Sequence, residues 1–188
     1  MRITDITIFH GYGVTPEKMW FPWIHQELES LGYAVNVPKL PDPLRPDYKK
    51  WHAVGAPIAR RWGRGSLVIG HSVGGAFALR LIEREVKTRI GGFVLVSSPF
   101  TATINVKPFV KFFAQPMDWM RVRDIARDIS VIHAKNDPIV PYDHATRYGE
   151  ALGAQVTLTG SGGHFTDKTC KPLLRVLRTD FGIAKRQR

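Results

Sequence analysis

The chain has 188 residues, of which 44% are hydrophobic, and carries 27 basic against 16 acidic residues, a formal net charge of +11. This length fits one domain with a single sizeable core, and no apolar run reaches membrane-spanning length. The one cysteine, Cys170, excludes an internal disulfide and a zinc site built from several cysteines. Residues 3–9 form a strand pattern without the apolar core of a signal peptide, so we expect a cytoplasmic protein.

The positive charge could indicate an anionic partner, but the basic residues are scattered and aromatic residues are not interleaved with them. One basic stripe does recur at helical spacing: Lys168, Lys171, Arg175 and Arg178. Apolar residues lie on the other side of that helix: Cys170, Leu173, Leu174 and Leu177. The stripe is therefore interpreted as a solvated helix face, and neither a specific nucleic-acid partner nor a membrane is expected.

Short apolar runs alternate with helix-forming stretches along the whole chain. Strands are expected at 3–9, at 33–37, in the run from Ser66, and at 90–97, 129–134 and 155–159. Helices are expected at 22–31, at 48–62 with a break or a bend near residues 55–57, at 76–84, at 142–152, and after residue 165. This alternation predicts an α/β fold, a parallel sheet with helices on both faces.

The run from Ser66 ends in Gly70-His71-Ser72-Val73-Gly74, between a strand and a helix. A sharp turn there would lift the Ser72 side chain out of the fold and strain its backbone, with glycines on either side to avoid collisions. The N–H of Val73 would then point to where an oxyanion forms. The alternative is an ordinary glycine-rich turn, but the strand and helix context favours a nucleophile.

The first strand opens into His10-Gly11-Tyr12-Gly13-Val14-Thr15-Pro16. A dinucleotide fingerprint would need a third glycine where Pro16 stands, so that interpretation is rejected. The loop is predicted to form the second half of an oxyanion hole, through the N–H of Gly11 or Tyr12, with His10 as its brace.

A serine hydroxyl needs a base, and the base needs a carboxylate. Asp137 follows the fifth strand and His164 follows the sixth in a glycine-rich loop, so these two are the expected partners of Ser72. Asp128 precedes its strand, and Asp143 suits a helix start. The other histidines are predicted to lie elsewhere. His25, His52 and His144 are expected at the surface, His133 in the core, and His71 facing away from the turn.

Residues 98–127 are rich in aromatic residues and prolines. They are expected to form a partial cap of one or two short helices over the site, although the aromatics could instead simply pack the segment down. The candidate pocket residues are Phe100, Phe109, Phe112, Phe113 and Trp119. Residues 184–188 are expected to fray. No metal-binding spacing and no phosphate loop occurs, so no cofactor is expected.

Several motifs together resemble the small, single-domain α/β-hydrolases of the retinoblastoma-binding protein 9 and YdeN type. They are His10-Gly11-Tyr12-Gly13, Trp20-Phe21-Pro22-Trp23, residues 38–43 with Trp51, Gly70-His71-Ser72-Val73-Gly74, residues 135–141, and Gly162-Gly163-His164-Phe165. The resemblance spans nearly the whole chain. It implies a six-stranded sheet and a Ser72, Asp137 and His164 triad. The Leu-x-Cys-x-Glu motif by which the human relative binds retinoblastoma protein is absent, so that interaction is not carried over.

The expected function is therefore that of a serine hydrolase acting on a small ester, thioester or activated amide through an acyl-enzyme on Ser72. A protein-interaction module on a hydrolase fold is the alternative, since a fold alone does not decide function. The acyl group, the leaving group and the oligomeric state are left open.

Overall fold

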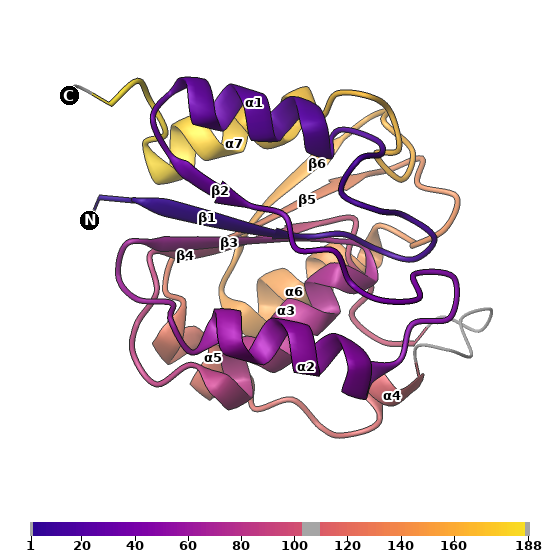
Figure 1. Ribbon diagram of the computed structural model, residues 1–188. Helices are drawn as coiled ribbons and strands as arrows, with labels where there is room; N and C mark the ends of the chain where they lie inside the picture. Colours follow the sequence, from indigo (N-terminus) through magenta and orange to yellow (C-terminus); the bar gives the residue numbers. More distant parts are fainter. Residues whose placement is uncertain (1, 103–109, 187–188) are drawn as a thin grey trace.

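The computed structural model describes residues 2–102 and 110–186. Within them, six strands form one parallel sheet in the order β2-β1-β3-β4-β5-β6 (Figure 1). The strands are β1 (Asp5–Phe9), β2 (Ala34–Asn36), β3 (Ser66–His71), β4 (Gly92–Val96), β5 (Ile129–Ala134) and β6 (Gln155–Thr159). The predicted parallel sheet is confirmed.

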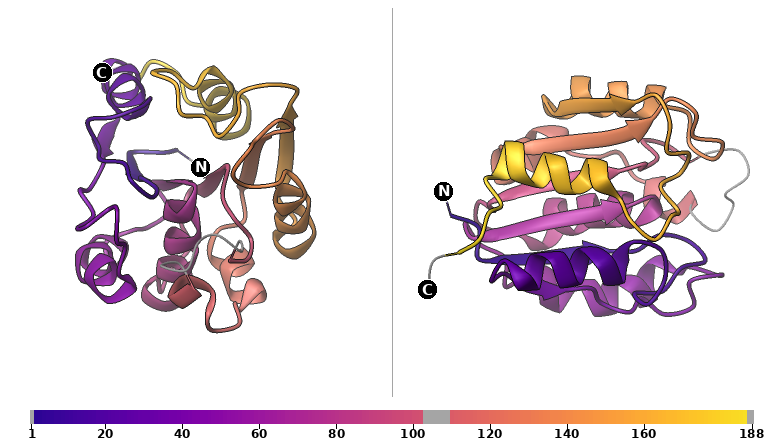
Figure 2. Two further views of the ribbon diagram at one scale, coloured as in Figure 1. Left: turned by 90° about the vertical axis from the view of Figure 1, so that its right-hand side faces the viewer. Right: turned by 90° about the horizontal axis from the view of Figure 1, so that it is seen from above.

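Helices cover both faces of this sheet. The described helices are α1 (Phe21–Ser30), α2 (Tyr48–Ala59), α3 (Val73–Glu85), α4 (Val110–Phe113), α5 (Trp119–Ile125), α6 (Asp143–Leu152) and α7 (Lys171–Phe181). Helices α1 and α7 lie on one face, and α2, α3, α5 and α6 lie on the other (Figures 1 and 2). None of these helices is both long enough and apolar enough to cross a membrane.

The alternation of side chains along each strand divides the core into two layers. In β1, Ile6 and Ile8 pack in the layer beneath α1 and α7, together with Trp20. Phe9 faces the opposite layer and meets the ring of Phe77 on α3 at 5.3 Å, edge to face. Every residue of β3, β4 and β5 is buried, because strands covered on both faces need apolar residues on both.

Of the break or bend expected near residues 55–57, the break is absent, because α2 continues through Pro57. Tertiary packing outweighs the lost hydrogen bond, since Gly55 sits so close to Phe77 and Leu81 that a Cβ there would lie 2.7 Å from each. The close packing of Gly55 holds α2 against α3 next to the proline.

All the parallel strands end at one edge of the sheet, and both described chain ends lie at the opposite edge (Figure 1). The C-terminal tail does not fray as far as the structure describes it. The Ala184 carbonyl accepts a hydrogen bond from Tyr33, and Arg186 N–H donates to Leu31 O at 2.9 Å. Residues 187–188 lie outside the described residues.

Candidate active site

Ser72 lies at the carboxyl edge of the sheet, between the end of β3 and the start of α3. Its backbone angles are φ 52° and ψ −132°, a region that non-glycine residues rarely adopt. The strain is held by the N–H of Ser72, which donates to Val96 O on the neighbouring strand at 2.8 Å. The strained strand-to-helix turn predicted from the sequence is therefore present.

The glycines around Ser72 are needed for close backbone approach. A Cβ on Gly70 would lie 2.3 Å from the Cα of Gly75, and one on Gly74 would lie 2.4 Å from the carbonyl oxygen of His10. Real Cβ atoms do not come so close to backbone atoms, so larger residues would force the turn open. The second contact also packs the start of α3 against the loop that follows β1.

That loop lies directly over the candidate nucleophile. A Cβ on Gly11 would lie 2.8 Å from Ser72 Cβ and 3.4 Å from its Oγ. Val73 is the first residue of α3, where N–H groups have no acceptor within the helix. Backbone donors from the two predicted halves of an oxyanion hole therefore flank one side chain.

His10 fixes the direction of this loop. Its Nε2 accepts a hydrogen bond from Leu40 N–H at 3.0 Å, so Nδ1 carries the proton and donates to Gly11 O, also at 3.0 Å. In a planar trans peptide the C=O and N–H point in opposite directions. Anchoring the Gly11 carbonyl thus also sets the direction of the N–H of Tyr12, one of the two candidate oxyanion donors in this loop.

Asp137 and His164 are brought together although 27 positions separate them. His164 Nδ1 donates to Asp137 Oδ2 at 2.8 Å, and the N–H groups of Ile139 and Val140 donate to Asp137 Oδ1 at 2.9 and 3.0 Å. Burial by itself raises the pKa of Asp137, but the nearby N–H groups of His133, His164 and Val140 outweigh it and hold that pKa well below its usual range. The acid is a carboxylate over the whole physiological range.

The competing aspartates have other surroundings. Asp128 precedes β5, and its backbone carbonyl accepts a hydrogen bond from Phe93 N–H near the starts of the strands, away from Ser72. Asp143 occupies the first turn of α6, as expected from its place in the sequence. Of the three aspartates considered, Asp137 is the one that contacts His164.

The loop that carries His164 is shaped by three residues with positive φ angles and by two long-range hydrogen bonds. Gly162, Gly163 and Phe165 have positive φ angles of 136°, 53° and 49°. Gly163 N–H donates to the Asn136 side chain at 3.0 Å, and the indole of Trp20 donates to Phe165 O at 2.9 Å. The base loop is thus held both by the acid loop and by the segment before α1.

His71 makes a contact that the sequence did not reveal. Its ring is buried below the turn, as expected, but its Nε2 donates to the backbone carbonyl of His164 at 2.9 Å, and the two rings lie 5.1 Å apart. Burial, followed by the neighbouring His164, lowers the pKa of His71 to about 3. In the described chain no hydrogen bond joins Ser72 Oγ to His164. The link between the two residues runs through His71, and such catalytic contacts commonly tighten only around substrate.

The predicted surface position of His144 is wrong. Its side chain is buried, and Nδ1 accepts a hydrogen bond from Phe100 N–H at 2.8 Å, which anchors the start of the cap on α6. Burial lowers the pKa of His144. A histidine one residue into a helix gives no sequence signal for this role, because its partner lies 44 positions away.

A cavity of about 160 Å³ lies between α3 and the cap. Its lining includes four of the five residues predicted for the pocket: Phe100, Phe112, Phe113 and Trp119. Phe109 lies outside the described residues. Phe100 and Trp119 stack at 4.8 Å, whereas Phe112 is fully buried against Trp51 and Phe77 and so belongs equally to the core.

Arg80, on α3, joins the cap to the body of the protein. Its buried guanidinium donates to the carbonyls of Phe112, Gln115 and Pro116 and pairs with Glu83 at 3.0 Å. Glu83 in turn accepts a hydrogen bond from Asp118 N–H at 2.8 Å, before α5. These contacts engage the arginine with protein acceptors, so its charge in the cavity wall is already compensated.

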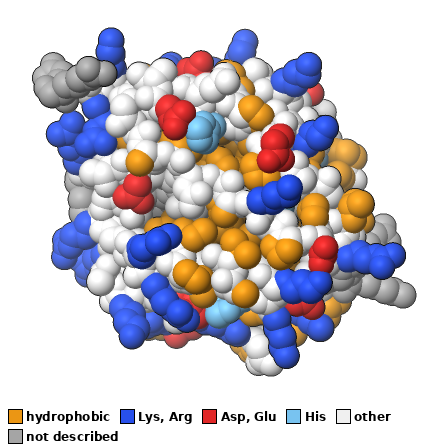
Figure 3. Space-filling view, viewed as in Figure 1, with side chains coloured by type: hydrophobic (Ala, Val, Ile, Leu, Met, Phe, Trp, Pro, Cys, Tyr) orange, Lys and Arg blue, Asp and Glu red, His pale blue; other side chains and the backbone are white. Residues whose placement is uncertain are grey.

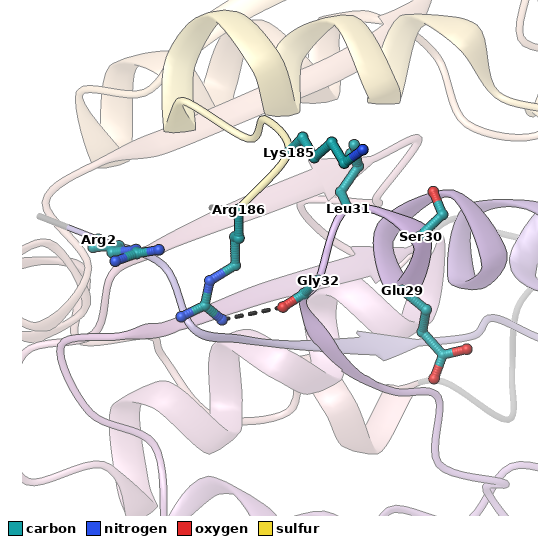
Figure 4. A pocket seen from close by; sticks show the side chains of 7 residues that line it. All are labelled: Arg2, Glu29, Ser30, Leu31, Gly32, Lys185 and Arg186. Carbon is teal, nitrogen blue, oxygen red and sulfur yellow. Dashed lines mark hydrogen bonds between the residues drawn. The ribbon is translucent and has the colours of Figure 1, made fainter. Parts of the chain in front are cut away.

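A larger open pocket, of about 1000 Å³, lies at the other edge of the sheet, far from Ser72. Figure 4 shows its lining, in which Arg2, Lys185 and Arg186 surround the end of α1, and the Arg186 guanidinium donates to Gly32 O. None of Ser72, Asp137 and His164 is among the residues that line it. Elsewhere on the face seen in Figure 3, basic side chains are spread among acidic ones instead of forming one patch.

No group of three or more His, Cys, Asp or Glu side chains in the described residues could hold a metal ion. The side chains of Ser72, His164 and Asp137 lie at the carboxyl edge of the sheet, together with backbone N–H groups of the loop after β1 and of the start of α3.

Comparison with known proteins places this site in a wider group. The sequence model of the serine hydrolase family matches residues 6–170. The chain is 25% identical over 164 residues to the hydrolase YdeN of Bacillus subtilis (strain 168), covering 87% of this chain and 86% of YdeN. It is 22% identical over 173 residues to the serine hydrolase RBBP9 of Rattus norvegicus, covering 90% of each.

The structures agree with the sequences. The crystal structure of the ydeN gene product from B. subtilis superposes with a TM-score of 0.90, over 95% of this chain and 99% of that chain, at 24% identity. The α/β-hydrolase fold and the resemblance drawn from the motifs are thereby confirmed.

Proposed function

Because the chain belongs to the serine hydrolase family, we propose that it cleaves a small ester, thioester or activated amide through an acyl-enzyme on Ser72. The main support is the 2.8 Å contact between His164 Nδ1 and Asp137 Oδ2, at the sheet edge from which Ser72 projects. A serine on a strained turn, with an imidazole oriented by a carboxylate at the same edge of the sheet, is the arrangement that acyl transfer requires.

The reaction follows from these positions. His164 Nε2 accepts the hydroxyl proton of Ser72 as Oγ attacks the substrate carbonyl, and the negative charge of Asp137 stabilises the resulting imidazolium. Oxygen of the tetrahedral intermediate is bound by the N–H groups of Val73 and of Gly11 or Tyr12. His164 then gives its proton to the leaving group, and water releases the acyl group by the same steps in reverse.

We further propose that the acyl group enters the cavity between α3 and residues 98–127, whose described lining does not itself include Ser72, and that the enzyme therefore prefers small, neutral acyl groups. Its walls include stacked aromatic rings, and its one buried cation, Arg80, already donates to cap carbonyls and Glu83. A substrate carboxylate would therefore enter an apolar space without a free partner, which is unfavourable. Its volume of about 160 Å³ suits short chains or a single ring.

A fluorophosphonate probe, with mass spectrometry to locate the adduct, tests the proposal directly. We expect one label on Ser72, no label in Ser72→Ala, and full labelling in Ser130→Ala, which removes a buried serine at the far end of β5. p-Nitrophenyl acetate and butyrate should be hydrolysed, while the p-nitrophenyl ester of succinic acid, which ends in a carboxylate, should be poor. A folded protein that neither labels nor hydrolyses these esters would favour the protein-interaction alternative.

A further inference from the structure

His133 is the third side chain at the candidate acid, and the mechanism above gives it no role. It lies on β5, fully buried, four residues before Asp137. Its Nε2 is 2.8 Å from Val140 O and 3.3 Å from Asp137 Oδ2, the same oxygen that His164 meets. A buried imidazole that only filled space in the core would not need to face two oxygen atoms.

The neighbours of Nε2 determine where the proton is. A carbonyl and a carboxylate both accept hydrogen bonds, so Nε2 must carry the hydrogen and donate. Val140 O takes the shorter bond, and the carboxylate lies near enough to feel the positive end of the same N–H dipole. The tautomer of His133 is thus set by the acid loop.

His133 and Asp137 hold the acid loop from opposite sides. The N–H of Val140 donates to Asp137 Oδ1, while its carbonyl accepts from His133. Residues 137–140 are therefore closed into a turn by the carboxylate and tied back to the end of β5 by the imidazole. Rotation of the Asp137 carboxylate would disturb both its hydrogen bond from Val140 N–H and the bond from His133 to Val140 O.

We propose that His133 is a positioning residue, which holds the Asp137 carboxylate and its loop so that Oδ2 meets His164 Nδ1. The inference rests on the proposed function, since it concerns the acid of that reaction. Other titratable groups also face the cluster: His164 from the loop after β6, His71 from β3, and His144 from α6 with Asp143 and Arg147 beside it. They are left intact in the variants below.

Three substitutions at one position separate positioning from packing. His133→Gln keeps an amide N–H at nearly the reach of Nε2, His133→Asn carries the same amide one methylene shorter, and His133→Leu fills the space without a donor. Ser130→Ala is the matched control, because it removes a buried hydrogen bond to a carboxylate, Asp180, from the other end of the same strand.

We expect His133→Leu and His133→Asn to lower kcat for p-nitrophenyl acetate at least tenfold, with KM within about twofold, and His133→Gln to stay within about threefold of wild type. Loss of the donor leaves Asp137 better able to stabilise a charged imidazole, so the acid limb of the rate profile should move upward by about half a pH unit in the Leu variant. Ser130→Ala should change thermal stability only. All rates are expressed per folded protein, measured by circular dichroism.

Equal activity of the Gln, Asn and Leu variants would overturn the inference, as would a fall in melting temperature with unchanged kcat and pH profile. If the variants do not fold, nitrogen-15 spectra of the wild-type histidines decide, since the inference requires a proton on Nε2 of His133 and fails if it is on Nδ1. Ser72→Ala and Asp137→Asn keep the two proposals apart. If Ser72→Ala and Asp137→Asn are inactive while His133→Leu is active, only the role of His133 is rejected. If Ser72→Ala and Asp137→Asn are themselves active, the proposed function is rejected.

Discussion

The ring of His71 and the backbone of His164, 93 positions apart, are joined by a hydrogen bond of 2.9 Å from Nε2–H to the carbonyl oxygen. His71 directly precedes Ser72, so this bond ties the turn of the candidate nucleophile to the loop of the candidate base. The ring is also enclosed by Trp20 at 5.6 Å and Phe21 at 6.0 Å, which leaves it little freedom to turn away.

Replacing His71 by phenylalanine should keep the aromatic packing and remove the donor. We expect kcat to fall by about fivefold, since one lost hydrogen bond of about 1 kcal/mol releases the His164 loop. Ester hydrolysis by His71→Phe is compared with that by His25→Phe, a half-exposed histidine on α1. Unchanged kcat in His71→Phe would mean that the loop keeps its place without this bond.

Stability should fall in mild acid because of the same histidine. The pKa of His71 is 6.5 in the unfolded chain and about 3 in the folded protein, so below pH 6.5 the unfolded chain takes up a proton that the folded one does not. The contribution of His71 to the free energy of unfolding is complete above pH 6.5 and is lost as the pH falls toward 3. Between pH 7 and 4.5 the loss is roughly 2–3 kcal/mol.

Urea unfolding at pH 7 and pH 4.5 measures this loss. The buried histidines His10 and His144 also have lowered pKa values and add to the slope in the same direction. The carboxyl of Asp137, whose pKa is depressed, adds a further loss only below its ordinary value of 3.8. The His71→Phe variant should show a visibly flatter dependence between the two pH values, and an equally steep one would refute the assignment.

Gly11 should tolerate no side chain. The methyl group of Gly11→Ala would lie 2.8 Å from Ser72 Cβ and 3.2 Å from His71 O, so either the loop or the serine must move. We expect kcat/KM for p-nitrophenyl acetate to drop by about two to three orders of magnitude, the usual cost of losing an oxyanion donor. Gly63→Ala, at a glycine with open space around it, is the control and should retain full activity.

The cap cavity predicts different outcomes for neighbouring phenylalanines. Phe113 and Trp119 are only partly buried, so Phe113→Ala or Trp119→Ala should enlarge the space and shift the preferred p-nitrophenyl ester to a longer chain. Each added methylene should contribute at most about 0.8 kcal/mol to transition-state binding. Ester profiles that stay unchanged in both variants would place the acyl pocket elsewhere.

Phe112→Ala should instead behave as a core mutation. Phe112 is buried between Trp51 and Phe77, and its removal should cost about 3–5 kcal/mol in the free energy of unfolding. Chemical denaturation of Phe112→Ala and Phe113→Ala under the same conditions distinguishes the two positions. Similar losses of stability would show that both rings belong to the core.

The sequence could predict what depends on neighbours along the chain. The turn at Ser72 follows from two glycines between a strand and a helix, and the unusual backbone of the loop that carries His164 follows from the glycines before it. Asp137 could be preferred to Asp128 as the acid because Asp137 follows β5 and Asp128 precedes it, and this order is read directly from the chain. The parallel sheet follows from the alternation of apolar runs with helix formers.

What the sequence could not predict depends on partners far along the chain. His71 and His144 each acquire their role from a backbone group 93 or 44 positions away, and nothing in the flanking residues marks that group. The choice between a broken and a continuous α2 could not be made from the sequence for a related reason, since the packing of Gly55 against α3 depends on residues far along the chain. His133 could be placed in the core, but its contact with the acid depends on the shape of the loop that follows.

The two described chain ends lie at the sheet edge opposite Ser72 (Figure 1). A fusion partner or surface tether attached at either end would therefore extend away from the catalytic edge, and a substrate would still approach that edge from open solvent. Immobilised through its tail, the protein should present its site outward. The same geometry makes both ends suitable places for affinity tags in all the activity measurements described above.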